Sequence, residues 1–422
     1  MSTTEDSKKS SKHNDELYDY LLKLPKVELH AHLNGCIREE TLFALAAERG
    51  VTLPAAYFHP HNNNSDEDDG LLYNTMPRSL TDCFAMFAEI PAAVNDLAAL
   101  RRITREALED FAAHAVVYVE LRSTPKRLWR DFRTQEQEEM ATKREYIETI
   151  LQVMEQIEAQ EEERYERQVQ QQIAAGEDLS LSMPRPPLKC RFLVSVDRSQ
   201  SEQEAAEHVD LAIALRSNDK NPRVVGMDLG GNPTKKDFRL FCSHFERARA
   251  SGLRITLHCA EIPCDPQSAN NPRAYQEAKA ILDFAPHRIG HALLLPPDLQ
   301  SLLMQRQIPV ETCPTSNVMT LELARNHHDG THLTLLQGLA QHGNLRQWLS
   351  PQQHHPLVIC TDDPGVFGTD LTKEWWLVAK TFDISRDYFD NLATKSMEFA
   401  FCDDATRHAI VERLKKVGFG KD

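Results

Sequence analysis

The chain lacks three features that mark special classes of protein. None of its nine cysteines forms a Cys-x-x-Cys pair, which argues against a zinc ribbon or a disulfide framework and favours a reducing compartment. No stretch of about 18 uncharged apolar residues occurs, so no membrane helix is predicted. The polar residues 1–14 lack the apolar core of a signal peptide. We therefore expect a cytosolic protein.

Positive charge is also scarce. The formal net charge is -15 at pH 7 and the sequence pI is about 5.7, which disfavours electrostatic capture of nucleic acid or of anionic membranes. A local basic pocket for one small phosphate is still compatible with this balance. Hydrophobic residues make up 41% of the 422 residues, enough for a large core. We expect a monomer that binds a small molecule, with no nucleic-acid or membrane partner.

Eight short β-rich runs alternate with helical patterns, such as those over residues 39–49, 98–113, 204–217 and 236–251. Several runs are continuously apolar, as parallel strands covered on both faces are. The alternation predicts an α/β fold, a (β/α)8 TIM barrel with helical insertions, whose core needs about 250 residues. An open doubly wound sheet is the alternative. The predicted strands span residues 26–32, 115–121, 191–196, 223–229, 254–259, 288–293, 307–312 and 356–361.

The remaining length predicts the domain organisation. Residues 1–20 are expected to be a disordered tail, and residues 21–422 a single barrel domain. An acidic loop is expected near residues 62–70, and a polar helical insertion near 155–188. Because this insertion is rich in Glu, Gln and Arg, we interpret it as a solvated extension rather than a partner-binding device.

His30 and His32 stand one residue apart at the end of the first predicted strand. Side chains at i and i+2 of a strand point to the same face, so two such imidazoles can bind one metal ion. Two hydrogen-bonded histidines in a half-buried strand are the alternative reading of this pair alone.

Three later motifs favour the metal. His258-x-x-Glu261, Gly290-His291 and Asp362-Asp363 each follow an apolar run. Burying such groups is costly unless a cation compensates them, and barrel active sites lie at the C-terminal ends of the strands. Each motif alone would also fit a core histidine, a turn or a helix cap.

Imidazoles and a carboxylate are natural zinc ligands, and a catalytic zinc site keeps one position for water. The sequence therefore predicts one Zn²⁺ per chain. Zinc lowers the pKa of bound water to about 7. We expect His291 to orient that water and Glu261 to donate a proton. The predicted ligands are His30, His32, His258 and Asp362.

Together these motifs resemble the adenosine deaminase family of zinc-dependent purine deaminases, over residues 24–376. The resemblance implies the metal-dependent hydrolase type of barrel and hydrolytic removal of an amine from purine C6. It implies that Glu261 protonates purine N1, Asp363 contacts N7 and the Gly231 backbone contacts N3. The signature of nucleic-acid-editing zinc deaminases, His-x-Glu with Pro-Cys-x-x-Cys, is absent. The landmarks are residues 26–33, His258-x-x-Glu261, Gly290-His291 and residues 361–364.

Residue 34 indicates the branch of the family. Adenosine deaminases proper usually have Asp two residues after the second zinc histidine, whereas this chain has Asn34, similar to the adenosine deaminase-like branch of N6-methyl-AMP deaminases. A carboxylate there would repel a substrate phosphate. Residues 123–126 supply hydroxyls and a cation for that phosphate, unless Lys126 belongs to a solvated basic turn. The expected substrate contacts are His32, Asn34, Ser123, Thr124, Pro125, Lys126, Asp197, Gly231 and Asp363.

One departure from the family pattern stands in the region before the second strand, where Pro91 occupies the place of a substrate-contacting histidine. The leading prediction is a deaminase that converts N6-methyl-AMP to IMP and methylamine. Deamination of adenosine or adenine is the alternative, and an inactive barrel that only binds ligands is a remote one.

Overall fold

The computed structural model describes most of the chain. The predicted acidic loop near residues 62–70 lies outside the described residues, as do residues 1–15 of the predicted tail. Residues 16–20, which the sequence analysis assigned to that tail, are instead part of a helix over residues 16–23, and the Tyr20 hydroxyl donates to Asp390. The described stretches are 16–53, 79–134, 140–176, 184–217, 222–264, 272–324, 333–350 and 355–416.

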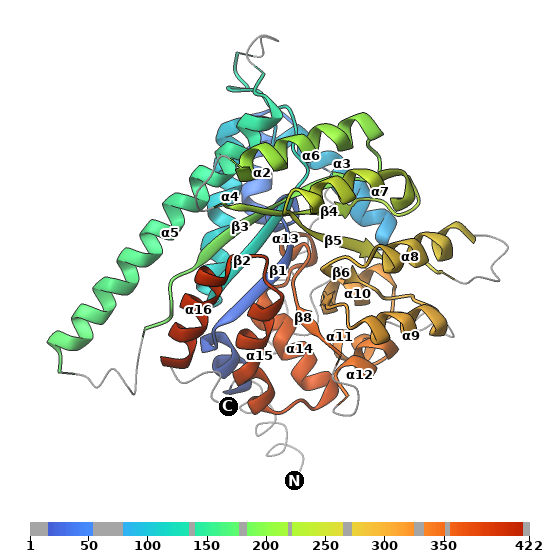
Figure 1. Ribbon diagram of the computed structural model, residues 1–422. Helices are drawn as coiled ribbons and strands as arrows, with labels where there is room; N and C mark the ends of the chain where they lie inside the picture. Colours follow the sequence, from blue (N-terminus) through green and yellow to red (C-terminus); the bar gives the residue numbers. More distant parts are fainter. Residues whose placement is uncertain are drawn as a thin grey trace, which may run out of the picture.

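Eight strands pair in sequence order, each parallel to the next. Figure 1 shows the sheet curling into a barrel with the helices outside it. The predicted (β/α)8 TIM barrel is therefore confirmed. The strands are β1 (Lys26–His32), β2 (Val116–Ser123), β3 (Lys189–Asp197), β4 (Val224–Gly230), β5 (Arg254–Cys259), β6 (Arg288–His291), β7 (Val310–Thr312) and β8 (Leu357–Ile359).

The barrel closes between β1 and the residues that follow β8. The backbone N–H of Asp362 donates to His30 O at 2.8 Å, and the His32 N–H donates to Asp362 O at 2.9 Å. This bridge pairs Asp362 with Ala31 in parallel. The closing seam thus runs through three of the predicted metal ligands.

The helices cover the barrel through amphipathic faces. In α4, for example, Leu100, Ile103, Ala107 and Phe111 are buried at helical spacing, and Asp96 caps the helix by accepting the Ala99 N–H. The helices are η1 (Leu33–Cys36), α2 (Glu39–Glu48), α3 (Leu80–Ala93), α4 (Leu97–Ala113), α5 (Lys143–Ala174), α6 (Glu202–Ser217), α7 (Phe238–Ala250), α8 (Pro272–Phe284), α9 (Pro297–Arg306), α10 (Pro314–Thr320), α11 (Leu335–Leu339), α12 (Gly343–Trp348), α13 (Pro364–Phe367), α14 (Leu371–Phe382), α15 (Arg386–Phe399) and α16 (Asp404–Lys416).

The first part of the predicted polar insertion near 155–188 belongs to α5, which begins earlier and ends at Ala174, while residues 177–183 lie outside the described residues. Thr142 and Glu145 form a capping box that starts the helix at Lys143. Its buried residues end at Ile157, and the rest of the helix extends beyond the barrel (Figure 1). Glu162 still ties this part to α16 through an ion pair with Arg413, 2.7 Å long.

The barrel interior contains a buried ionic network. Glu311 of β7 accepts from Arg122 of β2 at 3.0 Å and from Arg288 of β6 at 2.5 Å. Arg288 also pairs with Glu120 at 2.6 Å, and its guanidinium lies 3.5 Å from the centre of the Phe401 ring. Each buried charge has a partner of opposite sign, as burial requires.

The cysteines and helices agree with two expectations from composition. All nine cysteines are free thiols. Among the described residues, no helix combines the length and the apolarity needed to cross a membrane.

Candidate active site

Four side chains converge at the C-terminal mouth of the barrel: His30 and His32 of β1, His258 of β5, and Asp362 after β8. Nε2 of His32 lies 3.1 Å from Nε2 of His258. Oδ1 of Asp362 lies 3.3 Å from Nε2 of His30 and 3.4 Å from Nε2 of His32. One ligand atom from each of the four lies within 4.8 Å of all the others. The structure therefore brings the predicted ligands together.

Carboxylates behind two of these imidazoles fix their orientation. His258 Nδ1 lies 2.9 Å from Asp228 Oδ1, and His30 Nδ1 lies 2.6 Å from Glu311 Oε2. A proton on each Nδ1 leaves the lone pair of each Nε2 directed into the cluster. The Nε2 of His30 is buried and has no hydrogen-bond partner. The Nε2 lone pairs of His30 and His258 thus point into the same small space, an arrangement that fits a metal ion.

The charge balance also calls for a cation. Burial and Arg122 lower the pKa of His30, but the nearby carboxylates of Asp362 and Glu311 outweigh them and raise that pKa to about 9. Burial lowers the pKa of His32 well below its ordinary value, so this imidazole is neutral. A divalent ion held by neutral imidazoles and Asp362 would supply the positive charge that the carboxylates favour.

A second group of metal-binding residue types, His291, Cys313 and Asp362, shares one member with the first. Burial raises the pKa of the Cys313 thiol well above its ordinary value. Because a thiolate is the metal-binding form, the group with three imidazoles is the better ligand set.

The strand ends that carry the site have unusual backbone conformations. Asp362 has φ 64°, and the consecutive residues His291 and Ala292 have φ 61° and 52°. Residues other than glycine rarely adopt the left-handed region, and they do so at functional sites held by their surroundings. Ser316 of α10 holds Asp362 by donating to its Oδ2 at 2.7 Å, which leaves Oδ1 for the cluster.

Two further acids stand beside the cluster. Glu261 Oε1 lies 3.7 Å from Nε2 of His291, and Glu261 Oε2 is buried without a partner. Burial, Asp362 and Glu261 raise the pKa of Asp363 well above its ordinary value. A Cβ at Gly35 would lie 1.7 Å from Asp363 Oδ1, so only glycine fits there.

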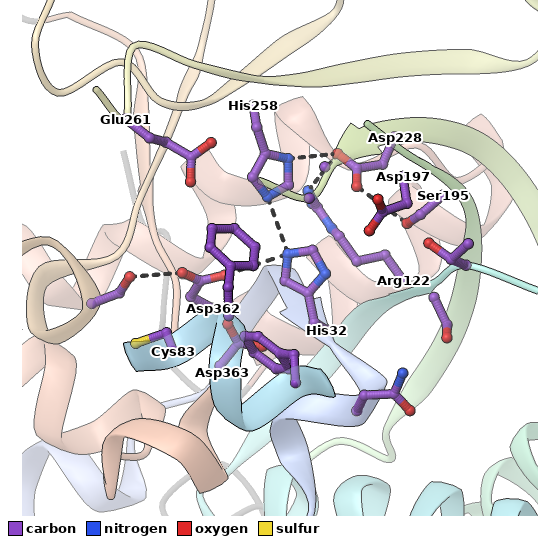
Figure 2. Close-up of a pocket in the computed structure, with 18 of the residues that line it drawn as sticks. His32, Cys83, Arg122, Ser195, Asp197, Asp228, His258, Glu261, Asp362 and Asp363 are labelled. Carbon is purple, nitrogen blue, oxygen red and sulfur yellow. Dashed lines mark hydrogen bonds and ion pairs between the residues drawn. The ribbon is translucent and has the colours of Figure 1, made fainter. Parts of the chain in front are cut away.

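A pocket of about 380 Å³ opens over these groups. In Figure 2, Glu261 and Asp197 lie on opposite sides of it, with His258 between them. Apolar side chains of α3, including Cys83, contribute to the wall. The residues that line the pocket include His32, Asn34, Cys83, Phe84, Phe87, Arg122, Ser123, Thr124, Lys126, Asp197, Asp228, Gly231, His258, Glu261, Asp362 and Asp363.

The side of the pocket formed by β2, β3 and the residues after them carries polar groups and two cations, Arg122 and Lys126. Burial lowers the pKa of Lys126, and Asp197 opposes that shift. Among the described residues, no hydrogen bond or ion pair is made by the Lys126 ammonium. Gly231 has φ 84°, and a Cβ there would lie 2.6 Å from Asp197 Oδ2, so this close approach also needs glycine.

Most predicted site residues line the pocket. His30, His291 and Pro125 are buried and do not line it, although His30 and His291 contact Asp362. No histidine of α3 lines the pocket, and Phe84 and Phe87 lie on that wall instead.

Sequence reasoning missed Arg122, Glu311, Ser316 and Asn317, and did not include Asp228 among the expected site residues. A charged residue inside an apolar strand was the available signal for Arg122, Asp228 and Glu311. Ser316 and Asn317, in a short helix after β7, had no comparable signal.

Comparisons with known proteins agree with this site. The sequence model of the adenosine deaminase family matches residues 25–417. The N6-mAMP deaminase of Arabidopsis thaliana is 34% identical over 397 residues, covering 93% of this chain and 96% of the relative. The N6-methyl-AMP deaminase of Homo sapiens is 32% identical over 397 residues, covering 92% of each chain.

A solved structure also resembles this chain over most of its length. The crystal structure of Arabidopsis ADAL complexed with IMP has a TM-score of 0.70 and 31% sequence identity, and the match covers 94% of this chain and 98% of that one. The named relatives are deaminases, which are hydrolases that act on C–N bonds. The chain belongs to the adenosine deaminase family.

Proposed function

We propose that this protein is a zinc-dependent deaminase that acts at C6 of a purine nucleotide and converts N6-methyl-AMP to IMP and methylamine. The observation that carries the proposal is that one pocket joins the His/Asp cluster and Glu261 with a cation, Lys126, for which no hydrogen bond or ion pair is found within the described part of the chain. Named relatives with 34% and 32% identity are N6-methyl-AMP deaminases, and one similar structure contains IMP.

The proposed metal ligands are His30, His32, His258 and Asp362. Zinc bound there would supply a Lewis acid that makes water nucleophilic near neutral pH. Asp228 and Glu311 hold two of the imidazoles, and Ser316 holds the carboxylate. Such partners normally raise metal affinity by fixing the orientation of the ligands.

The proton chemistry falls to the chain's own residues. Glu261 is the proposed donor to purine N1, because its carboxyl lines the pocket beside the cluster. A proton on N1 makes C6 more electrophilic. Asp363, whose pKa is raised by burial, would contact N7, and the Gly231 backbone would contact N3. His291 would hydrogen-bond the oxygen that attacks C6.

The polar side of the pocket, formed by β2 and β3 and the residues after them, would bind the ribose phosphate. Ser123 and Thr124 supply hydroxyls, Lys126 supplies the charge, and Asp197 is the proposed ribose contact. Asn34, which lines the same pocket, adds no negative charge. A phosphate would give Lys126 an anionic partner. Pro125 does not line the pocket, so its proposed role is to hold this loop rather than to contact substrate.

Steady-state kinetics on purified, zinc-loaded protein test the proposal. We expect kcat/KM for N6-methyl-AMP to exceed that for adenosine by at least about 100-fold, the value of a charge-assisted contact of roughly 3 kcal/mol. A preference for adenosine over N6-methyl-AMP would overturn the substrate assignment. Zinc content near one ion per chain is expected, and an active protein free of zinc would overturn the metal assignment. The single domain over residues 21–422, the monomeric state and the cytosolic location stay predictions.

A further inference from the structure

A chain of hydrogen bonds runs from His291 away from the pocket. Nδ1 of His291 lies 3.3 Å from Oδ1 of Asn317 in α10, and Nδ2 of the same amide lies 3.1 Å from Nε2 of His342. All three side chains are buried. Neither Asn317 nor His342 lines the pocket, so neither contacts a substrate there directly.

The far end of the chain has a defined protonation state. His342 is the N-cap of α12, and its Nδ1 accepts the backbone N–H of Leu345 at 3.1 Å. Burial lowers the pKa of His342 to about 4, so the imidazole is neutral at pH 7. A neutral imidazole carries one proton, and Nδ1 is already an acceptor. The proton of His342 is therefore on Nε2.

The proton on Nε2 of His342 sets the orientation of the Asn317 amide. A protonated Nε2 on His342 needs an oxygen acceptor, but the structure sets the NH2 group of Asn317 there. The amide must therefore be turned by 180°, which hardly changes its shape and brings the oxygen to His342 and the NH2 group to His291. The reverse orientation would set the NH2 donors against the N–H of His342. With an NH2 donor beside it, Nδ1 of His291 is the acceptor. The proton of neutral His291 is then on Nε2.

That Nε2–H points toward the reacting groups. It lies 3.7 Å from Glu261 Oε1 and 3.9 Å from Asp362 Oδ2. Both distances are too long for hydrogen bonds. Among the described residues nothing else accepts from it, which leaves the donor for an oxygen atom of substrate or water.

We propose that Asn317 and His342 are positioning residues that keep the proton of His291 on Nε2. This inference rests on the proposed role of His291 in deamination. In this tautomer His291 donates a hydrogen bond to the oxygen that attacks C6 and has no lone pair on Nε2 with which to remove its proton. The acid and base steps then fall to other groups, and His291 stabilises the negative charge that develops on oxygen.

The same helix also holds the backbone of His291. Asn344, in the first turn of α12, donates from Nδ2 to Leu293 O at 2.7 Å and to Ala292 O at 3.4 Å. His291 and Ala292 have the consecutive positive φ angles described above. Thus α12 supports both the ring of His291 and the strained turn that carries it, which is the arrangement expected of a positioning element.

Nitrogen-15 NMR of zinc-loaded, [15N]histidine-labelled protein tests the tautomer without any turnover. The His291 signals are identified as those missing from His291→Asn. We expect the chemical shifts of a protonated Nε2 and a bare Nδ1. A protonated Nδ1 with a bare Nε2 would overturn the proposal, whether or not the protein deaminates N6-methyl-AMP. A failure of the proposed function would instead appear only in the kinetic measurements.

Asn317→Asp is the matching variant, because a carboxylate of the same size accepts from both histidines and pulls the proton of His291 to Nδ1. We expect kcat to fall roughly 10- to 100-fold at a nearly unchanged KM, with a shifted pH profile and altered His291 shifts. A wild-type kcat with a wild-type pH profile would contradict the proposal. If Asn317→Asp does not fold, the wild-type spectrum decides.

Variants of His342 separate positioning from packing. His342→Gln keeps an N–H donor for the Asn317 oxygen and should retain much more of kcat than His342→Leu, which removes the donor. His355→Gln is the control, since His355 is an equally buried histidine whose Nε2 lies 3.0 Å from Ile308 O, outside this chain of hydrogen bonds. Equal kcat losses in His342→Gln and His342→Leu, with His355→Gln unaffected, would overturn the role of the donor.

Discussion

Glu311 and His30 are joined by a hydrogen bond of 2.6 Å between Oε2 and Nδ1. Although burial raises the pKa of Glu311, Arg122 and Arg288 lower it well below its ordinary value, so this carboxylate is charged. It therefore accepts the proton of Nδ1 and leaves Nε2 of His30 free to bind a metal. The ionic network inside the barrel thus extends to the proposed zinc ligands.

Glu311→Gln is expected to weaken zinc binding by roughly 10- to 100-fold, because a neutral amide orients and polarises His30 less well. Competition with a chelator, followed by metal analysis of the protein, measures the change. Glu120→Gln is the matched control, since Glu120 is also buried and paired with Arg288 but does not contact a ligand. Equal zinc affinity in Glu311→Gln and wild type would show that the carboxylate has no such role.

Glu261→Gln is expected to keep the fold and the zinc and to lower kcat by about 10²- to 10⁴-fold, because an amide cannot deliver a proton to purine N1. Circular dichroism and metal analysis establish that the variant is intact, and steady-state kinetics measure the loss. Turnover at the wild-type rate would remove Glu261 from the role of acid.

Lys126→Gln is expected to raise KM for N6-methyl-AMP by roughly 10- to 100-fold, because a charge-assisted contact with phosphate is lost, and to leave KM for adenosine nearly unchanged. Arg127→Gln provides the control, since Arg127 is the exposed neighbour and does not line the pocket. A rise of the same size for both substrates would mean that Lys126 does not recognise phosphate.

The buried His355 predicts a pH effect on stability. Burial lowers its pKa from 6.5 to about 4 in the folded state. The unfolded chain therefore binds the proton first, and the stability that His355 contributes above pH 6.5 is lost as the pH falls toward 4. At pH 5 the loss relative to pH 7 is about 1 to 2 kcal/mol.

Denaturant unfolding of wild type and His355→Gln at pH 7 and pH 5 measures this loss. The glutamine side chain does not titrate, so the variant should lose less stability than wild type over that interval. Comparing the two proteins cancels the opposite effect of Glu28 and Glu374, whose pKa values burial raises to about 7. Parallel losses in both proteins would refute the assignment to His355.

The sequence predicted the barrel and the side chains that meet at its mouth because both depend on local patterns. Apolar runs gave β1 and β5 their correct bounds, and ionisable residues at the ends of such runs gave the site. The strand ends were less predictable because backbone turns set them. The predicted strand 307–312 is shorter, since Gln307 ends α9 with φ 51°. The predicted strand 288–293 stops at His291, where φ becomes positive.

The groups behind the site were harder to predict for a different reason. Glu311 orients an imidazole only because it lies beside His30, 281 positions earlier in the chain. Asp228 does so only because it lies beside His258, 30 positions later. Such pairs depend on the register between strands, which no local pattern reports. The predicted strand 356–361 ends early, at Ile359, for a related reason. Beyond that point the chain turns from β7 toward β1, where Asp362 pairs with Ala31.

The pairing of Asp362 with Ala31 has a consequence for the order in which the protein can be completed. A nascent chain that stops before β8 already carries the three imidazoles of the proposed metal site, but it lacks both Asp362 and the eighth strand of the barrel. Both arrive in the same step, when the backbone of Asp362 docks between His30 and His32. Synthesis of β8 and the residues after it therefore completes the proposed metal site and closes the barrel together.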